Sequence, residues 1–295
     1  MADGTTIFRG VQTALATPML DGKVSWADLE KLVAAQMEAG VTGLVAVGTT
    51  GESPTLTTDE HIGVIQKVRE LSGGKVPVIA GTGSNSTAEA LHLSKEAENV
   101  GADALLLVAP YYNKPNQEGL FLHFSAIAEA TSIPILLYSI PSRCGIEIGV
   151  ETVVRLREKY PLVCGIKEAG GSCDRVISLV SALDDQFAVT SGDDGLTLPF
   201  LSLGATGVVS VASNAFPAEL IEMVDSFSNN PEKANRIFRR FAPLFSALFV
   251  EPNPVPVKFV LREMGLLQSA EVRLPLAPIS SETEELLRSL LAEIE

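Results

Sequence analysis

A lysine ends an apolar segment in the second half of the chain. The apolar residues 162–166 are followed by Lys167 and Glu168, and then by Ala-Gly-Gly. A lysine ammonium group is costly to bury and usually lies on a surface. In an apolar pocket the neutral amine is favoured, and it can attack a ketone to form a Schiff base. Lys167 is therefore a candidate nucleophile; the alternative is a structural lysine paired with Glu168 or another acid.

Other polar side chains follow apolar runs and could assist such an amine. Tyr138 could transfer protons if neighbours hold its hydroxyl, although a lone tyrosine there is more often part of a core or interface. Thr49 and Thr50 lie between glycines and could bind a carboxylate through hydroxyl and backbone N–H groups, or could simply end a strand. Arg143 offers a planar fork for a carboxylate. Together these residues favour amine chemistry on a substrate that carries a carboxylate.

Motifs for several other chemistries are missing or incomplete. His61, His92 and His123 all fall on expected helices, which disfavours a histidine metal site or a Ser-His-Asp triad. There is no GxxxxGK[ST] motif, and the Gly-Thr-Gly at 81–83 lacks the third glycine of GxGxxG. The three cysteines have no CxxC spacing. We therefore expect no metal, and dinucleotide binding has little support.

A recurring pattern of helix, glycine and apolar run indicates how these residues are positioned. The runs are apolar without alternation, which is typical of parallel strands buried on both faces, and the glycine suits the end of the preceding helix. Amphipathic helical segments lie between the runs at 26–39, 59–71, 87–100, 119–130 and 150–159. Eight candidate strands result, at 11–17, 44–47, 76–82, 104–108, 134–138, 162–167, 187–191 and 208–211.

Eight alternations of strand and helix predict an α/β fold, either a (β/α)8 TIM barrel or a doubly wound sheet, and we favour the barrel. We place the barrel at 1–228 and a C-terminal helical appendage of limited independent stability at 229–295. In a TIM barrel the chemistry lies at the carboxyl ends of the strands, where the candidate residues stand. The appendage is expected to contain three helices, at 231–247, 256–267 and 281–294.

The charge and the termini restrict the partners. The net charge is −14, with 22 basic and 36 acidic residues, so neither nucleic acid nor an anionic membrane surface is expected as a partner. The first residues show no signal-peptide pattern, and no apolar segment is long enough to span a bilayer. We expect a cytoplasmic protein.

Six segments resemble, in order and at similar spacing, the pyruvate-dependent class I aldolase superfamily that includes N-acetylneuraminate lyase. The resemblance covers nearly the whole chain, and the ordered set is far more specific than any one motif. Arg143, within PSRCG, makes the chain most similar to the branch that condenses pyruvate with L-aspartate 4-semialdehyde in lysine (diaminopimelate) biosynthesis. The segments are GTTGES (48–53), YYN (111–113), YxxPxRxG (138–145), GIKEA (165–169), SGDD (191–194) and EPNPVPVK (251–258).

The resemblance implies a role for each catalytic candidate. Lys167 would form the Schiff base with pyruvate. Tyr138 would relay protons with Thr49 and with a Tyr112 that reaches in from a neighbouring subunit. Thr49 and Thr50 would bind the pyruvate carboxylate.

The resemblance also implies the remaining parts of the site and the assembly. Arg143 would organise the entrance for aspartate semialdehyde, and the backbone carbonyls of Gly192 and Val209 would line the pocket. No nicotinamide, flavin or metal would be needed, and the chain would form a homotetramer built as a dimer of dimers. Two alternatives stay open: a lyase or dehydratase acting on a 2-keto-3-deoxy sugar acid or N-acetylneuraminate, and a non-catalytic barrel that binds a small acid.

An inhibitory site for L-lysine is a separate implication of the resemblance. The chain departs from many lysine-sensitive bacterial enzymes at Pro54 and Thr58, which stand where those enzymes carry Ala and His. A polar cluster of this kind is otherwise a solvated groove between subunits. The residues at the matching positions are Ser53, His61, Asn85, Glu89 and Tyr111.

Overall fold

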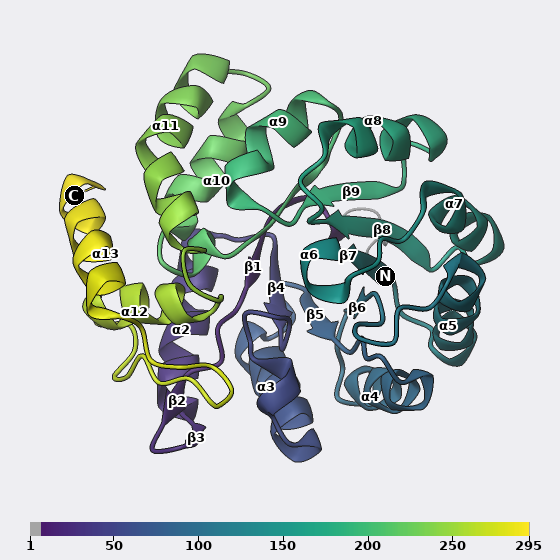
Figure 1. Ribbon diagram of the computed structural model, residues 1–295, viewed down its shortest axis with the longest axis horizontal. Coiled ribbons are helices and arrows are strands. Elements are labelled where there is room, and N and C mark those ends of the chain that lie inside the picture. The colour runs from purple at the N-terminus through teal and green to yellow at the C-terminus, as the bar shows by residue number, and fades with distance from the viewer. Residues whose placement is uncertain (1–6, 295) are drawn as a thin grey trace.

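Eight parallel strands close into a barrel in the computed structural model, which describes residues 7–294 (Figure 1). The barrel closes because β1 pairs with β10 on one side and with β4 on the other. The predicted (β/α)8 TIM barrel is therefore confirmed. The strands are β1 (Gly10–Ala14), β4 (Gly43–Ala46), β5 (Val78–Gly81), β6 (Ala104–Val108), β7 (Ile135–Ser139), β8 (Val163–Glu168), β9 (Ala188–Ser191) and β10 (Gly207–Ser210).

Helices surround the barrel and fill the connections (Figure 1). A small hairpin of β2 (Met19–Leu20) and β3 (Lys23–Val24) follows β1. This hairpin was not predicted, because two-residue strands carry no periodicity. The helices are α2 (Trp26–Ala39), α3 (Thr58–Ser72), α4 (Thr87–Asn99), α5 (Gln117–Ala130), α6 (Pro141–Cys144), α7 (Val150–Lys159), α8 (Cys173–Ala182), α9 (Thr197–Ser202) and α10 (Pro217–Ser226), with 3-10 turns at Ser53–Thr55, Asp194–Leu196 and Ala212–Asn214.

Alternation along β8 decides which side chains face the barrel interior. Ile166 belongs to the large core between the strands and the helices. Tyr138 and Val209 belong to a smaller buried cluster that is built from alternate strand residues and fills the inside of the barrel. Since successive side chains of a strand point to opposite faces, Lys167 points into the barrel and Glu168 points toward the helices.

The C-terminal segment, defined here as residues 231–294, lies against one side of the barrel (Figure 1). Its helix α11 packs against α10, and α13 packs against α11 and α12. The predicted helix at 256–267 was too long, because α12 stops at Glu263 and Gly265 adopts a left-handed φ of 74°. The helices are α11 (Pro231–Ala247), α12 (Val255–Glu263) and α13 (Ser281–Ile294).

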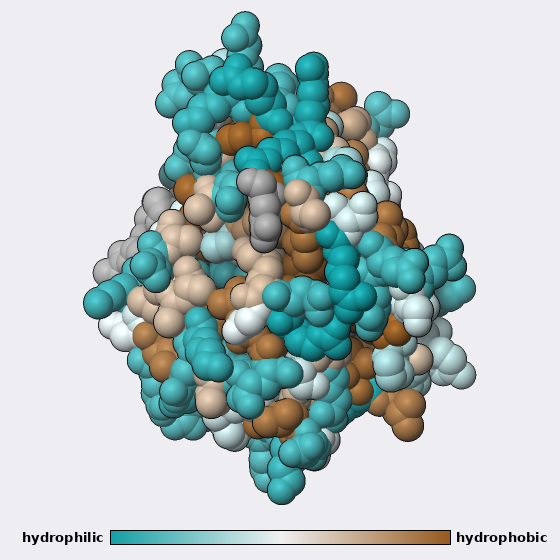
Figure 2. Space-filling view, turned by 90° about the vertical axis from the view of Figure 1, so that its left-hand side faces the viewer, coloured by the Kyte–Doolittle hydropathy of each residue, from teal (hydrophilic) through white to brown (hydrophobic). Residues whose placement is uncertain are grey.

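The outer face of the C-terminal side of the molecule is mainly hydrophilic, with small separate apolar patches (Figure 2). The inner faces of the same helices are apolar, and Phe241, Leu244 and Phe259 are fully or almost fully buried. This contrast is what an amphipathic helix packed on a core requires. Among the described residues, no helix is both long and apolar enough to cross a membrane.

Candidate active site

Lys167 and Tyr138 are neighbours at the carboxyl end of the barrel. They are paired in the register of β7 and β8, and Lys167 Nζ lies 4.2 Å from the centroid of the Tyr138 ring. Lys167 is 5% exposed and Tyr138 is 4% exposed. Within residues 7–294, no carboxylate pairs with the Lys167 amine. The geometry therefore presents an amine inside the barrel that lies over a tyrosine ring.

Glu168 is paired with a different cation. Its Oε2 accepts a hydrogen bond from Arg175 Nε at 2.7 Å, and its Oε1 accepts one from the Gly170 N–H at 2.7 Å. Arg175, on α8, also donates to Glu147 and to the carbonyl of Ile148. Burial raises the pKa of Glu168, and the charge of Arg175 opposes that rise. The alternative in which Glu168 neutralises Lys167 is not what the structure contains.

The loop after β4 carries Thr49 and Thr50 on a strained backbone. Val47 has a φ of +55°, which is unusual for a β-branched residue. Glycines make this path possible: a Cβ atom at Gly81 would lie 2.4 Å from the Val47 carbonyl oxygen, and one at Gly51 would lie 2.9 Å from Val47 Cα. Both backbones therefore pass too close for any side chain other than hydrogen.

The C-terminal segment holds this loop from outside. Asn253 Nδ2 donates to Thr50 Oγ1 at 3.0 Å. Two residues further along the loop, Glu52 forms an ion pair with Lys258 of α12, and both side chains are almost completely buried. Glu52 also accepts a hydrogen bond from the Arg273 N–H at 3.0 Å. The threonine loop is thus fixed by residues more than 200 positions away.

A cavity of about 220 Å³ opens at the same end of the barrel. Of the predicted site residues, Thr49, Tyr138 and Arg143 line it, together with Ser53 and Tyr111. Lys167, Thr50, Gly192 and Val209 do not line it, and Lys167 adjoins it through the ring of Tyr138. The remaining lining residues are Val47, Gly48, Pro54, Gly81, Gly83, Leu106, Val108, Ile140 and Cys144.

Arg143 and Cys144 lie on the short helix α6 and face the cavity differently. The Arg143 side chain is largely exposed, and its Nη2 donates to the backbone carbonyl of Asn253 at 3.4 Å. Cys144 is buried and its Sγ donates to the carbonyl of Ala109 at 3.1 Å. Burial raises the pKa of the Cys144 thiol to about 11. Arg143 keeps further N–H donors that could meet an anion at the entrance, whereas Cys144 stays a thiol and is a poor nucleophile.

Gly192 follows β9, and Val209 lies in the neighbouring strand β10. A Cβ atom at Gly192 would lie 3.0 Å from Lys167 Cε, and Val209 packs in the inner cluster with Tyr138. Asp194 ties these strand ends together, because its carboxylate accepts hydrogen bonds from Ser210 Oγ and from the Val211 N–H. Burial raises the pKa of Asp194.

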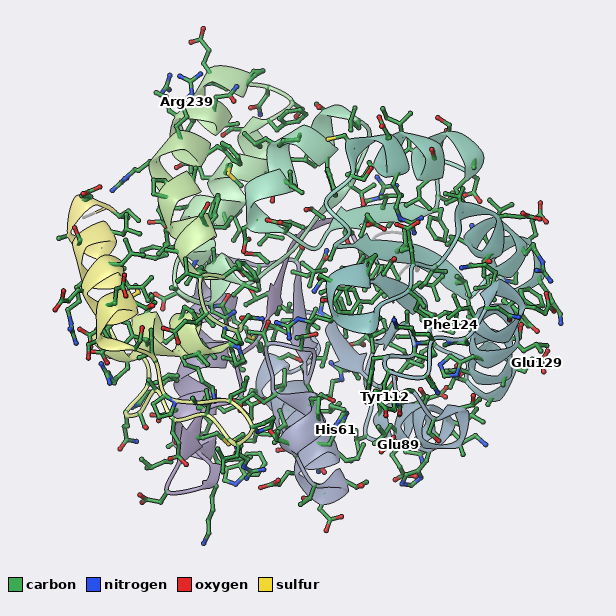
Figure 3. The ribbon with its side chains drawn as sticks, in the orientation of Figure 1. His61, Glu89, Tyr112, Phe124, Glu129 and Arg239 are labelled. Carbon is green, nitrogen blue, oxygen red and sulfur yellow. The ribbon has the colours of Figure 1, made fainter. Side chains whose placement is uncertain are left out.

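Tyr112 points away from the cavity of its own chain. It is 91% exposed, has a φ of +74°, and does not line the cavity. Figure 3 shows it in the same region of the view as Glu89 and His61, far from Arg239 on α11. A tyrosine held in this exposed position is available to a second copy of the chain.

The residues predicted for a lysine site are only partly brought together. Ser53 and Tyr111 line the cavity, whereas His61, Asn85 and Glu89 do not. The His61 Nε2 is hydrogen-bonded to the Gly81 carbonyl at 2.8 Å. Burial lowers the pKa of His61, and the negative charge of Glu89 opposes this. His61 and Glu89 are therefore close enough to interact electrostatically.

Three residues that shape the site were not predicted from the sequence: Asn253, Lys258 and Arg175. Asn253 and Lys258 fall in the EPNPVPVK segment, which was noted only as part of the resemblance. Their partners are distant in the sequence, so no local signal pointed to them. Among the described residues, no group of three or more His, Cys, Asp or Glu side chains is arranged to hold a metal ion.

Comparison with known proteins places the chain in one family. The model of the dihydrodipicolinate synthetase family matches residues 7–294. The 4-hydroxy-tetrahydrodipicolinate synthase of Sulfurihydrogenibium sp. is 47% identical over 97% of this chain and 98% of its own length.

Solved structures agree with that match. The 4-hydroxy-tetrahydrodipicolinate synthase from Methylacidiphilum fumariolicum SolV superposes with a TM-score of 0.95 at 53% identity, covering 97% of this chain and 95% of its own. The enzyme from Cyanidioschyzon merolae, solved with lysine bound, superposes with a TM-score of 0.95 at 44% identity, covering 98% of each chain. The chain therefore belongs to the dihydrodipicolinate synthetase family.

Proposed function

We propose that this protein condenses pyruvate with L-aspartate 4-semialdehyde to form 4-hydroxy-tetrahydrodipicolinate, a step of lysine biosynthesis. The observation that carries the proposal is the buried Lys167 amine, which lies over the Tyr138 ring while the adjacent Glu168 is bound to Arg175. The full-length similarity to synthases of that name supports the same reaction.

The amine performs the reaction through a covalent intermediate. The neutral Lys167 amine attacks the ketone carbon of pyruvate, water leaves, and the resulting iminium loses a methyl proton to become an enamine. The enamine carbon attacks the aldehyde of the second substrate. The amino group of that substrate then attacks the iminium carbon and closes the ring, which returns Lys167 to its free form.

The neighbouring residues supply protons and binding groups. Tyr138, together with Thr49 and a Tyr112 of a second copy, moves protons to and from the reacting atoms. Thr49 and Thr50 hold the carboxylate of pyruvate, and Arg143 meets the carboxylate of aspartate semialdehyde. The backbone carbonyls of Gly192 and Val209 face the bound intermediate. No nicotinamide, flavin or metal takes part, so activity should survive prolonged dialysis against a chelator.

Trapping with borohydride tests the central step. Wild-type protein mixed with pyruvate and borohydride should carry a reduced pyruvate adduct on Lys167, located by peptide mass spectrometry. Lys167→Ala should carry none, whereas Lys159→Ala, which changes an exposed lysine of α7, should label as the wild type does. Absence of an adduct in the wild type would overturn every Schiff-base mechanism for this protein.

A coupled assay tests the second substrate. With pyruvate and aspartate semialdehyde, the wild type should turn over and Lys167→Ala should not. Faster cleavage of a 2-keto-3-deoxy sugar acid or of N-acetylneuraminate would replace the proposed reaction with a lyase activity. Pyruvate labelling without any turnover would instead favour a barrel that only binds small acids.

We also propose that the active form is a homotetramer arranged as a dimer of dimers. The exposure of Tyr112 supports this, because its side chain is 91% exposed and does not line the cavity of its own chain. Sedimentation should give the mass of four chains. Mixing inactive Lys167→Ala chains with Tyr112→Phe chains should restore part of the activity if Tyr112 acts across an interface, and no restoration would contradict that role.

Inhibition by L-lysine is a further part of the proposal. Ser53 and Tyr111 at the cavity, together with His61 and Asn85, offer hydrogen-bonding groups, and Glu89 offers a negative charge for an ammonium. A titration of the coupled assay with L-lysine should lower the rate, and Glu89→Gln should weaken the inhibition. Full activity up to high millimolar lysine would overturn this regulation.

A further inference from the structure

Asn253 of the C-terminal segment touches two of the groups proposed to anchor the substrates. Its Nδ2 donates to Thr50 Oγ1 at 3.0 Å, and its backbone carbonyl accepts from Arg143 Nη2 at 3.4 Å. Asn253 is 5% exposed and Thr50 is 2% exposed. One buried residue therefore connects the threonine loop after β4 with the arginine after β7.

The hydrogen bond from Asn253 occupies one lone pair of the Thr50 hydroxyl and leaves its proton to be donated. A hydroxyl has one proton to donate and two lone pairs that accept. Because Thr50 Oγ1 already accepts the amide N–H, its own proton remains to be donated. Within residues 7–294 that proton has no protein acceptor. A carboxylate at the mouth of the barrel would supply one.

The orientation of the Asn253 amide supports this direction. Its Oδ1 is buried and has no hydrogen-bond partner among the described residues. Reversing the amide would let Oδ1 accept the Thr50 proton but would leave the buried NH2 group without an acceptor, and buried N–H groups are orphaned more rarely than buried carbonyl oxygens. The amide nitrogen therefore faces Thr50.

A second contact fixes the same loop, so the Thr50 hydroxyl keeps its orientation. Glu52 forms its buried ion pair with Lys258, which lies five residues after Asn253 in the chain. Thr50 and Glu52 are thus both bound to the same stretch of the C-terminal segment. A hydroxyl on a fixed loop, with one lone pair already occupied, loses little freedom when it donates to a ligand.

We propose that Asn253 is a positioning residue that directs the Thr50 hydroxyl toward the carboxylate of pyruvate. This inference rests on the proposed function, because it assumes that Thr50 binds that carboxylate. Asn253 does not itself touch pyruvate. It acts through Thr50, so a substitution of Asn253 should change the affinity for pyruvate.

The test measures the pyruvate concentration that gives half-maximal borohydride trapping, without the second substrate. Asn253→Leu removes the donor and should raise that concentration roughly tenfold, the loss expected for one hydrogen bond to a charged ligand. Asn253→Asp keeps the size but turns the Thr50 proton toward itself and adds negative charge, so its rise should be larger. Asn235→Leu is the matched control, since Asn235 lies exposed on α11 and bonds only locally to the Pro231 carbonyl.

A double variant tests whether the effect passes through Thr50. Thr50→Val should raise the half-maximal concentration, and adding Asn253→Leu to it should change little more. The KM for aspartate semialdehyde should stay within about threefold, because Arg143 is bound by the Asn253 backbone and not by its side chain.

The outcomes separate this inference from the proposed function. If the wild type forms no adduct, the proposed function fails. If the wild type forms the adduct, the inference is overturned in either of two cases. In one, Asn253→Leu and Asn253→Asp leave pyruvate binding unchanged. In the other, the effects of Thr50→Val and Asn253→Leu are additive.

Discussion

Glu168 and Arg175 are bound to each other in the buried layer between β8 and α8, with Oε2 and Nε 2.7 Å apart. Their side chains are 0% and 7% exposed. Because Lys167 points to the other side of the same strand, Glu168 does not pair with the amine inside the barrel. The ion pair with Arg175 therefore keeps the Glu168 carboxylate away from the Lys167 amine.

Removing Arg175 should leave a buried carboxylate without its cation. Arg175→Met should lower the free energy of unfolding by about 3–5 kcal/mol, the usual cost of breaking a buried ion pair. Adding Glu168→Gln should recover part of that loss, because no charge is then left in the core. Denaturant unfolding of both variants measures this, and equal or additive losses would contradict the coupling.

Lys258 and Glu52 form a second buried pair, which can be compared with an exposed one. Lys258→Met should destabilise the protein by about 3–5 kcal/mol, since both partners are inaccessible. Lys233→Met removes a pair with Glu222 in which both side chains are more than a third exposed, and it should cost at most about 1 kcal/mol. Similar losses of unfolding free energy in Lys258→Met and Lys233→Met would contradict the expected dependence on burial.

Glu60 should make stability depend on acidity. The hydrogen bonds from Arg273 lower the pKa of Glu60 from 4.5 to about 2 in the folded protein. The unfolded chain then binds this proton more readily, so the stabilisation is complete above pH 4.5 and is lost as the pH falls toward 2. Stability measured across this range should change less steeply in Glu60→Gln and in Arg273→Gln. An unchanged slope in both variants would contradict the linkage.

The Tyr138 hydroxyl should affect the rate more than the fold. Tyr138→Phe keeps the ring over Lys167 but removes the proton donor, so kcat should fall by roughly 10²-fold or more. The matched control is Tyr160→Phe, which removes a hydroxyl bound to Glu129 on the outside of the barrel and should leave kcat unchanged. Equal rates in Tyr138→Phe and the wild type would remove Tyr138 from the mechanism.

Gly192 should tolerate no side chain. Gly192→Ala places a methyl group 2.7 Å from Ala169 Cβ and 3.0 Å from Lys167 Cε. The displacement of Lys167 should slow pyruvate trapping by roughly 10²-fold. Gly63→Ala, in the interior of α3 where the nearest atom is Trp26 Cη2 at 3.4 Å, should trap normally and gain up to about 1 kcal/mol of stability.

The barrel was predictable because its strands carry a strong local signal. The predicted strand at 104–108 has the same bounds as β6. The other predicted strands lie within a few residues of the observed ones. The short helix α9 was not assigned, because six residues containing Pro199 show too little periodicity. The end of α12 was misplaced because the effect of Gly265 outweighed an apolar sequence that continues to Leu267.

The site was predictable only where neighbouring strands bring its residues together. Lys167 and Tyr138 end adjacent strands, so the barrel topology alone makes them neighbours. The partners of Thr50 and Glu52 lie 203 and 206 residues away. Such contacts depend on how the C-terminal segment docks, and a single sequence contains no periodic or spacing signal for that.

The C-terminal segment is also synthesised after the strands whose loop it holds. A ribosome releases the eight strands before it has made Asn253, Lys258 or Arg273. At that stage the lysine and tyrosine of the barrel are already present, but Thr50 and Glu52 lack the partners in the C-terminal segment that will later hold them. The growing chain therefore completes the strands of its barrel before it contains the residues that hold Thr50 and Glu52.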